Sequence, residues 1–124
     1  MTTPYVEKLG LSAKTNEAVD QVFNLFEVLE DESRIPLDLT GRSFFAQART
    51  AKSRTAPLMC EIQVSIYGDP MNGQLWFYVP ESITKDLQVI KGHYDVLTRI
   101  GSGPVDNLWQ APFEITEGIS VWTL

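Results

Sequence analysis

Apolar and polar residues alternate most regularly between residues 58 and 66. Leu58, Cys60, Ile62, Val64 and Ile66 occupy every second position, and most of the residues between them are polar. Successive side chains of a β-strand point to opposite faces, so this pattern predicts a strand with one buried face.

Similar short apolar segments, separated by turn residues, recur along most of the chain after residue 20. We expect further strands at residues 21–30, 42–51, 74–79, 93–100 and 107–116, with a short extended piece at 35–39 and a last apolar stretch at 119–124. Several short strands at this spacing are typical of a sandwich or a barrel. We therefore expect an all-β fold, an immunoglobulin-like antiparallel β-sandwich of about six to eight strands.

One segment has a helical rather than an extended pattern. Ile83, Leu87 and Ile90 are spaced as on one face of a helix, and Ser82 is a possible N-cap. We expect a short helical crossover within residues 81–90.

The first twenty residues are polar and lack a sustained apolar period. We interpret residues 1–20 as an N-terminal arm or edge segment, and residues 21–124 as a single β-sandwich domain. A short helix within residues 12–23 is an alternative, because Ala13, Glu17 and Ala18 favour helix. The first residues do not resemble a signal peptide, so we expect the chain to be made and folded in a reducing cytoplasm.

Composition excludes several classes of function. The chain has 124 residues, enough for one domain, and a formal net charge of −6, which opposes binding to nucleic acid or to an anionic membrane. Cys60 is the single cysteine and His93 the single histidine, too few for a disulfide or a closed zinc site. We expect no cofactor and no metal.

Candidate catalytic groups do not form a recognisable set. His93, Asp95 and Ser102 contain the residue types of a hydrolase triad, but no G-x-S-x-G motif accompanies them. Cys60 lies on the expected buried face, where a cysteine acts as a small apolar filler. The acidic cluster around residues 27–32 lacks the pattern of a calcium loop, so we interpret it as a solvated turn. The chain is therefore not expected to be an enzyme.

Two groups of residues are candidates for an interface. Basic residues concentrate at Arg42, Arg49, Lys52 and Arg54, which form either a solvated loop or a docking site for an acidic partner or another copy. A second group is aromatic and consists of residues expected to point outward or to lie near the C-terminus: Trp76, Tyr78 and Trp122. For Trp76 and Tyr78, coverage by the N-terminal arm, a protein interface and a sugar-stacking platform all remain open.

Ordered motifs between residues 20 and 116 resemble a small β domain of tailed bacteriophages. This domain occurs at the N-terminus of baseplate upper proteins and tail-fibre proteins, and as free-standing virion proteins. The resemblance rests on the spacing of residues 23–29 with the acidic turn after them, 36–41 (PLDLTG), 44–49 (FFAQAR), 73–76 (GQLW), 83–87, 92–97 (GHYDVL) and 108–115.

The resemblance implies a non-catalytic structural protein of the virion, an adaptor or connector in a tail, baseplate or fibre-attachment assembly. It implies other virion proteins and copies of the chain itself as partners, with no nucleic acid and no membrane. Related proteins usually continue into a coiled coil or a receptor-binding tip, whereas this chain ends at Leu124. A connector, a decoration subunit or a fibre anchor is therefore expected, located in the virion. The alternative is a carbohydrate-binding module that uses Trp76, Tyr78 or Trp122.

Three residues of the PLDLTG motif have a physical role that can be predicted. Asp38 and Thr40 can bind backbone groups at a turn, and Gly41 allows a positive φ.

Tyr94, on an expected buried face, requires a hydrogen-bond partner for its hydroxyl. In the turn at residues 68–73, Asn72 and Gly73 are suited to positive φ.

Overall fold

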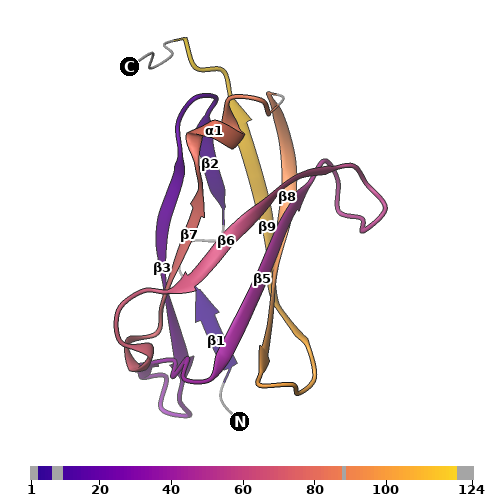
Figure 1. The fold of residues 1–124 in the computed structure, drawn as a ribbon. Helices are drawn as coiled ribbons and strands as arrows, with labels where there is room; N and C mark the ends of the chain where they lie inside the picture. Colours follow the sequence, from indigo (N-terminus) through magenta and orange to yellow (C-terminus); the bar gives the residue numbers. More distant parts are fainter. Residues whose placement is uncertain (1–2, 7–9, 88, 120–124) are drawn as a thin grey trace.

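The strands pair edge to edge in one curled sheet in the computed structural model (Figure 1). The structure describes residues 3–6, 10–87 and 89–119. Within them, neighbouring strands follow the order β1-β3-β7-β6-β5-β8-β9-β2, and β4 pairs with β3 beside this path. The expected all-β class is confirmed.

The strand boundaries agree closely with the expected ones from residue 19 onward. The strands are β1 (Thr3–Val6), β2 (Leu11–Lys14), β3 (Val19–Val28), β4 (Arg34–Pro36), β5 (Arg42–Arg49), β6 (Leu58–Ile66), β7 (Gln74–Val79), β8 (Ile90–Ile100) and β9 (Asp106–Thr116). The expected extended piece at 35–39 is a strand only at its start, although Leu37 and Leu39 are buried. The apolar stretch at 119–124 lies outside the described residues except for Ile119, which is not in a strand.

Strand β6 connects the two parts of the curled sheet. Its first half pairs with β5, where Cys60 lies opposite Ala48, and its second half pairs with β7, where Val64 lies opposite Phe77. Among the described strands, the pairs are antiparallel except for β2 with β9. The sheet can therefore curl about β6 and bring its inner faces together around one core.

The core is formed by the inward side chains of alternating strand positions. The Phe77 ring lies 5.7 Å from that of Trp109 and 6.2 Å from that of Tyr94, so β7 faces β9 and β8 across the interior. Phe23 on β3 packs edge-on against Phe77 at 5.1 Å. Side chains exposed by less than 2% and of large volume include Phe23, Phe77, Phe113, Leu25, Leu39, Leu75 and Ile115.

The helix considered for residues 12–23 does not form. Strand β2 occupies Leu11–Lys14, a turn follows, and β3 begins at Val19. Leu11 and Ala13 point inward and are 3% and 5% exposed, because they pair in parallel with Phe113 and Ile115 of β9. The segment before Asp20 thus places strands at both ends of the strand order and contributes side chains to the core.

A four-residue helix, α1 (Glu81–Thr84), follows β7. Its N-cap is Pro80 and makes no side-chain bond, so the expectation that Ser82 caps the helix is wrong. Thr84 is fully buried, and its Oγ1 donates to the carbonyl oxygen of Glu17 at 2.8 Å. The helix therefore anchors the turn between β2 and β3. No helix in the described part of the chain is long and apolar enough to cross a bilayer.

Several apolar side chains are more exposed than the alternation indicates. Leu58 and Ile100 lie at strand ends and are 49% and 59% exposed, because the core does not extend that far. Trp109 is half-buried. The alternation of apolar and polar residues predicts which face of the sheet a side chain points to. It does not predict whether the hydrophobic core extends as far as that side chain.

Two turns have the geometry expected from their residues at every predicted position except Asn72. Asp38 Oδ1 accepts hydrogen bonds from the backbone N–H of Thr40 at 2.9 Å and from its Oγ1 at 2.6 Å, and Gly41 has φ +76°. Gly73 has φ +68°, whereas Asn72 lies in a 3₁₀ helix with negative φ. Gly41 and Gly73 confirm the predicted positive φ, and Asn72 does not.

Candidate functional site

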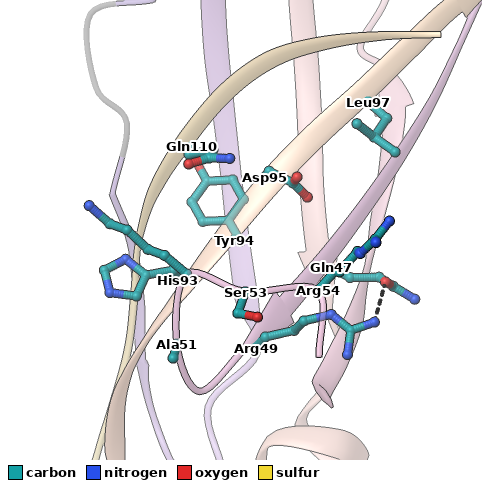
Figure 2. Close-up of a pocket in the computed structure, with 11 residues that line it drawn as sticks. Gln47, Arg49, Ala51, Ser53, Arg54, His93, Tyr94, Asp95, Leu97 and Gln110 are labelled. Atoms are coloured by element: carbon teal, nitrogen blue, oxygen red, sulfur yellow. Dashed lines mark hydrogen bonds between the residues drawn. The ribbon is translucent and has the colours of Figure 1, made fainter. Parts of the chain in front are cut away.

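A groove lies on the outer face of β5 and β8, under the loop that follows β5 (Figure 2). Its volume is about 420 Å³. The side chains that line it come from β5, β8, β9 and the loop, and they include Gln47, Arg49, Lys52, Ser53, Arg54, His93, Asp95, Leu97 and Gln110.

Strand register explains why these side chains gather. Gln47 lies opposite Asp95, and Arg49 lies opposite His93, so alternate residues of β5 and β8 point outward together. Gln110 of β9 lies opposite Asp95 on its other side. Residues 50–57 then form a compact loop over this face, held by backbone hydrogen bonds such as that from the Thr50 N–H to the Pro57 carbonyl at 3.1 Å.

Arg49 connects the loop to the sheet. Its Nη1 donates to the carbonyl oxygen of Ala56 at 2.9 Å, and its Nη2 donates to Oε1 of Gln47 at 3.1 Å. A guanidinium has five N–H donors, so these two bonds orient the group without exhausting it. The arrangement fixes a positive charge at the mouth of the groove.

The groove is positively charged although the chain is acidic. Arg49, Lys52 and Arg54 line it, and Asp95 is the carboxylate among the lining residues. Asp95 Oδ2 also accepts a hydrogen bond from Nδ2 of Asn107 at 2.9 Å. Three members of the predicted basic segment are thus brought together, but Arg42 lies at the other end of β5, opposite Ile100.

The groove contains one side chain with an unsatisfied nitrogen. His93 Nδ1 is buried and has no hydrogen-bond partner among the described residues. His93 and Asp95 share the outer face of β8, as their spacing predicts, while Ser102 follows the far end of that strand. The structure therefore does not bring the three residue types of a triad together.

Other candidates for chemistry are distant from the groove or lack suitable geometry. Cys60 points into the core, 7% exposed, and burial raises the pKa of its thiol to about 11, which opposes a nucleophilic role. Across the described ranges 3–6, 10–87 and 89–119, no three His, Cys, Asp or Glu side chains are placed to hold a metal ion.

The basic groove continues into an apolar surface that the sequence analysis missed. Phe45 lies directly opposite Leu97, and Leu97 lines both the groove and a second hollow of about 290 Å³. That hollow also includes Val105, and Phe45 and Val105 are 42% and 56% exposed. The available signal was the presence of Phe45 and Leu97 on the otherwise polar sides of their strands.

Trp76 and Tyr78 form a separate aromatic surface on the outer face of β7. Their ring centroids are 5.3 Å apart, and both side chains are half-buried. Trp76 Nε1 donates to Oδ1 of Asp20 on β3 at 2.6 Å. β1 pairs with β3 from Leu25 onward, beyond the stretch that pairs with β7. Trp122 lies outside the described residues.

Comparisons with known proteins assign the chain to no family. No protein-family model matches it, and no curated protein matches it significantly. Its function must therefore be inferred from these two outer surfaces and from the motif resemblance.

Proposed function

We propose that the chain is a non-catalytic structural protein of a tailed-bacteriophage virion. In this proposal it acts as an adaptor or connector in a tail, baseplate or fibre-attachment assembly, with other virion proteins and copies of itself as partners. It is made in the host cytoplasm and resides in the virion.

The architecture is consistent with the resemblance from which the proposal starts. The PLDLTG motif forms a tight turn before β5, with Asp38 binding Thr40 and Gly41 at positive φ. We extend the proposal to the finer fold type, an immunoglobulin-like sandwich. Its support is that β6 pairs with β5 and then with β7, while Phe77 packs across the core against Trp109 and Tyr94.

The observation that carries the proposal is the continuous outer surface of β5 and β8. A basic groove at one end passes through Leu97 into exposed Phe45 and Val105 at the other. Protein interfaces combine an apolar centre with a polar or charged rim, and arginine is enriched in them. A surface of this composition suits contact with another protein.

An adaptor also requires a second contact surface. Trp76 and Tyr78 lie on β7, which is separated from β5 by β6 in the strand order. Tryptophan and tyrosine are frequent energetic centres of protein interfaces. The two surfaces allow the chain to join two neighbours.

Mass spectrometry and immunogold labelling of purified phage particles test the proposal. We expect the chain in the particles at a fixed ratio to the tail proteins. A Phe45→Glu variant should lose incorporation, whereas Thr116→Glu, an exposed change at the end of β9, should retain it. Absence of the unaltered chain from purified particles would contradict the proposal.

A carbohydrate-binding module remains the second candidate because Trp76 and Tyr78 lie side by side on the surface. Aromatic rings of this kind can stack against sugar rings. Binding on a glycan array that is lost in Trp76→Ala would favour this candidate. No binding at millimolar sugar would exclude it.

A further inference from the structure

A second charged surface lies at the turn between β3 and β4. Glu30, Asp31 and Glu32 are all exposed there. Asp31 Oδ1 accepts hydrogen bonds from the Ser33 N–H at 3.0 Å and from the Ser33 hydroxyl at 2.6 Å, which gives the turn a defined shape. These bonds hold the pKa of Asp31 below its usual 3.8, so the carboxylate is charged at neutral pH.

An exposed apolar residue follows this acidic turn. Ile35 of β4 is 43% exposed, and Pro36 beside it is exposed as well. The order is thus three carboxylates, then Ser33 and the exposed cation Arg34, then an apolar pair, which leaves the segment with a net negative charge. On the face of β5 and β8, three cations at Arg49, Lys52 and Arg54 are followed by Phe45, Leu97 and Val105. The two surfaces are complementary in charge and in the order of charged and apolar parts.

The acidic turn and the basic groove cannot meet within one molecule. The acidic turn and β4 come shortly before the first residue of β5 in the chain. The groove lies at the other end of β5, beside its last residue, Arg49. Eight extended residues span about 26 Å. Figure 1 shows the turn after β3 at the lower end of the molecule and the loop after β5 at the upper right. Any pairing between these surfaces must therefore be intermolecular.

We propose that the acidic turn of one copy docks into the basic groove of a second copy, with Ile35 against the apolar surface around Phe45. This inference rests on the proposed function, since it names the partner of the same groove. A single contact of this kind is heterologous and generates a ring if the rotation closes or a filament if it does not, and two reciprocal contacts between the same two copies close a two-fold dimer.

Charge complementarity identifies a second copy as the occupant. The turn segment carries three carboxylates and one cation, Arg34, whereas the groove carries three cations and one carboxylate, Asp95, so the two surfaces have net charges of opposite sign. The pairs would lie at a partly exposed interface, so salt should weaken them. The Debye length falls from about 10 Å at 0.1 M to about 3 Å at 1 M, and association should decrease accordingly.

Complementary variants of the full chain provide the test. Lys52→Glu with Arg54→Glu disables the groove and leaves the acidic turn intact. Glu30→Lys with Glu32→Lys disables the turn and leaves Asp31, its shape and the groove intact. Sedimentation velocity and light scattering over micromolar to millimolar concentrations measure the assemblies.

We expect the unaltered chain to form oligomers that dissociate in 1 M salt. Each variant alone should associate at least tenfold more weakly. An equimolar mixture should associate again, because the intact turn of one variant meets the intact groove of the other, and the two reversed surfaces are also opposite in charge. Glu81→Lys with Asp86→Lys, the same charge change at exposed positions in and beside α1, should associate at least as well as the unaltered chain.

Several results would overturn the inference. These are a monomeric unaltered chain at every concentration, undiminished association of either variant, or a mixture that stays monomeric. Circular dichroism checks the fold, and the neutral changes Lys52→Gln with Arg54→Gln and Glu30→Gln with Glu32→Gln replace any pair that misfolds. A chain that is present in virions but monomeric contradicts this inference alone. A chain that assembles as expected but is absent from virions contradicts the proposed function alone.

Discussion

The indole Nε1 of Trp109 donates a hydrogen bond to the hydroxyl of Tyr94 at 2.9 Å. Tyr94 lies on β8 and is 2% exposed, and Trp109 lies on β9 next to it. Burial raises the pKa of Tyr94 to about 12. The alternation in β8 places Tyr94 on a buried face, where its hydroxyl requires a hydrogen-bond partner. The indole of Trp109 on the neighbouring strand β9 is such a partner.

Replacing Tyr94 by phenylalanine should lower the free energy of unfolding by about 1–2 kcal/mol, because the indole N–H of Trp109 loses its acceptor inside the protein. In a domain of this size the melting temperature should fall by about 4 °C. Urea denaturation and calorimetry measure the change. Tyr78→Phe removes a hydroxyl on the outer face and should be nearly neutral. Equal losses in the two variants would contradict the importance of the Trp109 bond.

Cys60 should make stability depend on pH in the alkaline range. The unfolded thiol loses its proton near pH 9, whereas burial raises the folded pKa to about 11. Between these values the unfolded state binds fewer protons, so stability is full below pH 9 and falls as the pH rises. The stability difference between the unaltered chain and Cys60→Ala should therefore shrink from pH 8 to pH 11.

Thiol labelling at pH 8 provides an independent check on Cys60. A low thiolate fraction and burial should make the folded chain react slowly, with full reaction after addition of urea. Rapid labelling of the folded chain would contradict both the burial and the raised pKa.

Two glycines with the same backbone conformation should respond differently to alanine. Gly68 and Gly73 have φ of +71° and +68°, so both substitutions are strained by about 1 kcal/mol. At Gly73 the added Cβ would lie 2.6 Å from the Leu25 carbonyl oxygen and 2.8 Å from the Leu37 nitrogen, while at Gly68 nothing lies within 4 Å. Gly73→Ala should lose at least twice as much stability as Gly68→Ala in urea denaturation. Equal losses would show that no close approach exists at Gly73.

The alternation of apolar and polar residues within single segments predicted the long strands that form the core. In β6 and β7 apolar residues recur at every second position, and the observed bounds equal the expected ones. Short strands were harder to predict, because a strand of four residues such as β2 has only two inward positions and so shows almost no alternation. Leu11 and Ala13 are inward in β2 only because β9 lies beside them, and a partner one hundred residues away leaves no local signal.

The same reasoning explains what was predictable at the surface. Outward positions of Trp76 and Tyr78 follow from alternation in one strand and are confirmed. The groove depends on Arg49 lying opposite His93, a register between strands that are far apart in the sequence. Alternation within one strand carries no information on that register, so the basic residues near the end of β5 could be grouped in advance, but His93 and Asp95 could not be placed beside them.

Thr84 should contribute to stability through its hydroxyl, which joins segments that are distant in sequence. Its Oγ1 donates to the Glu17 carbonyl at 2.8 Å, and the residue is fully buried. Thr84→Val keeps the shape but places a methyl group against that carbonyl, so the unfolding free energy should fall by about 1–2 kcal/mol. Thr116→Val makes the same change at an exposed position of β9 and should be nearly neutral. If the two variants lost equal stability in urea denaturation, α1 would not anchor the turn before β3.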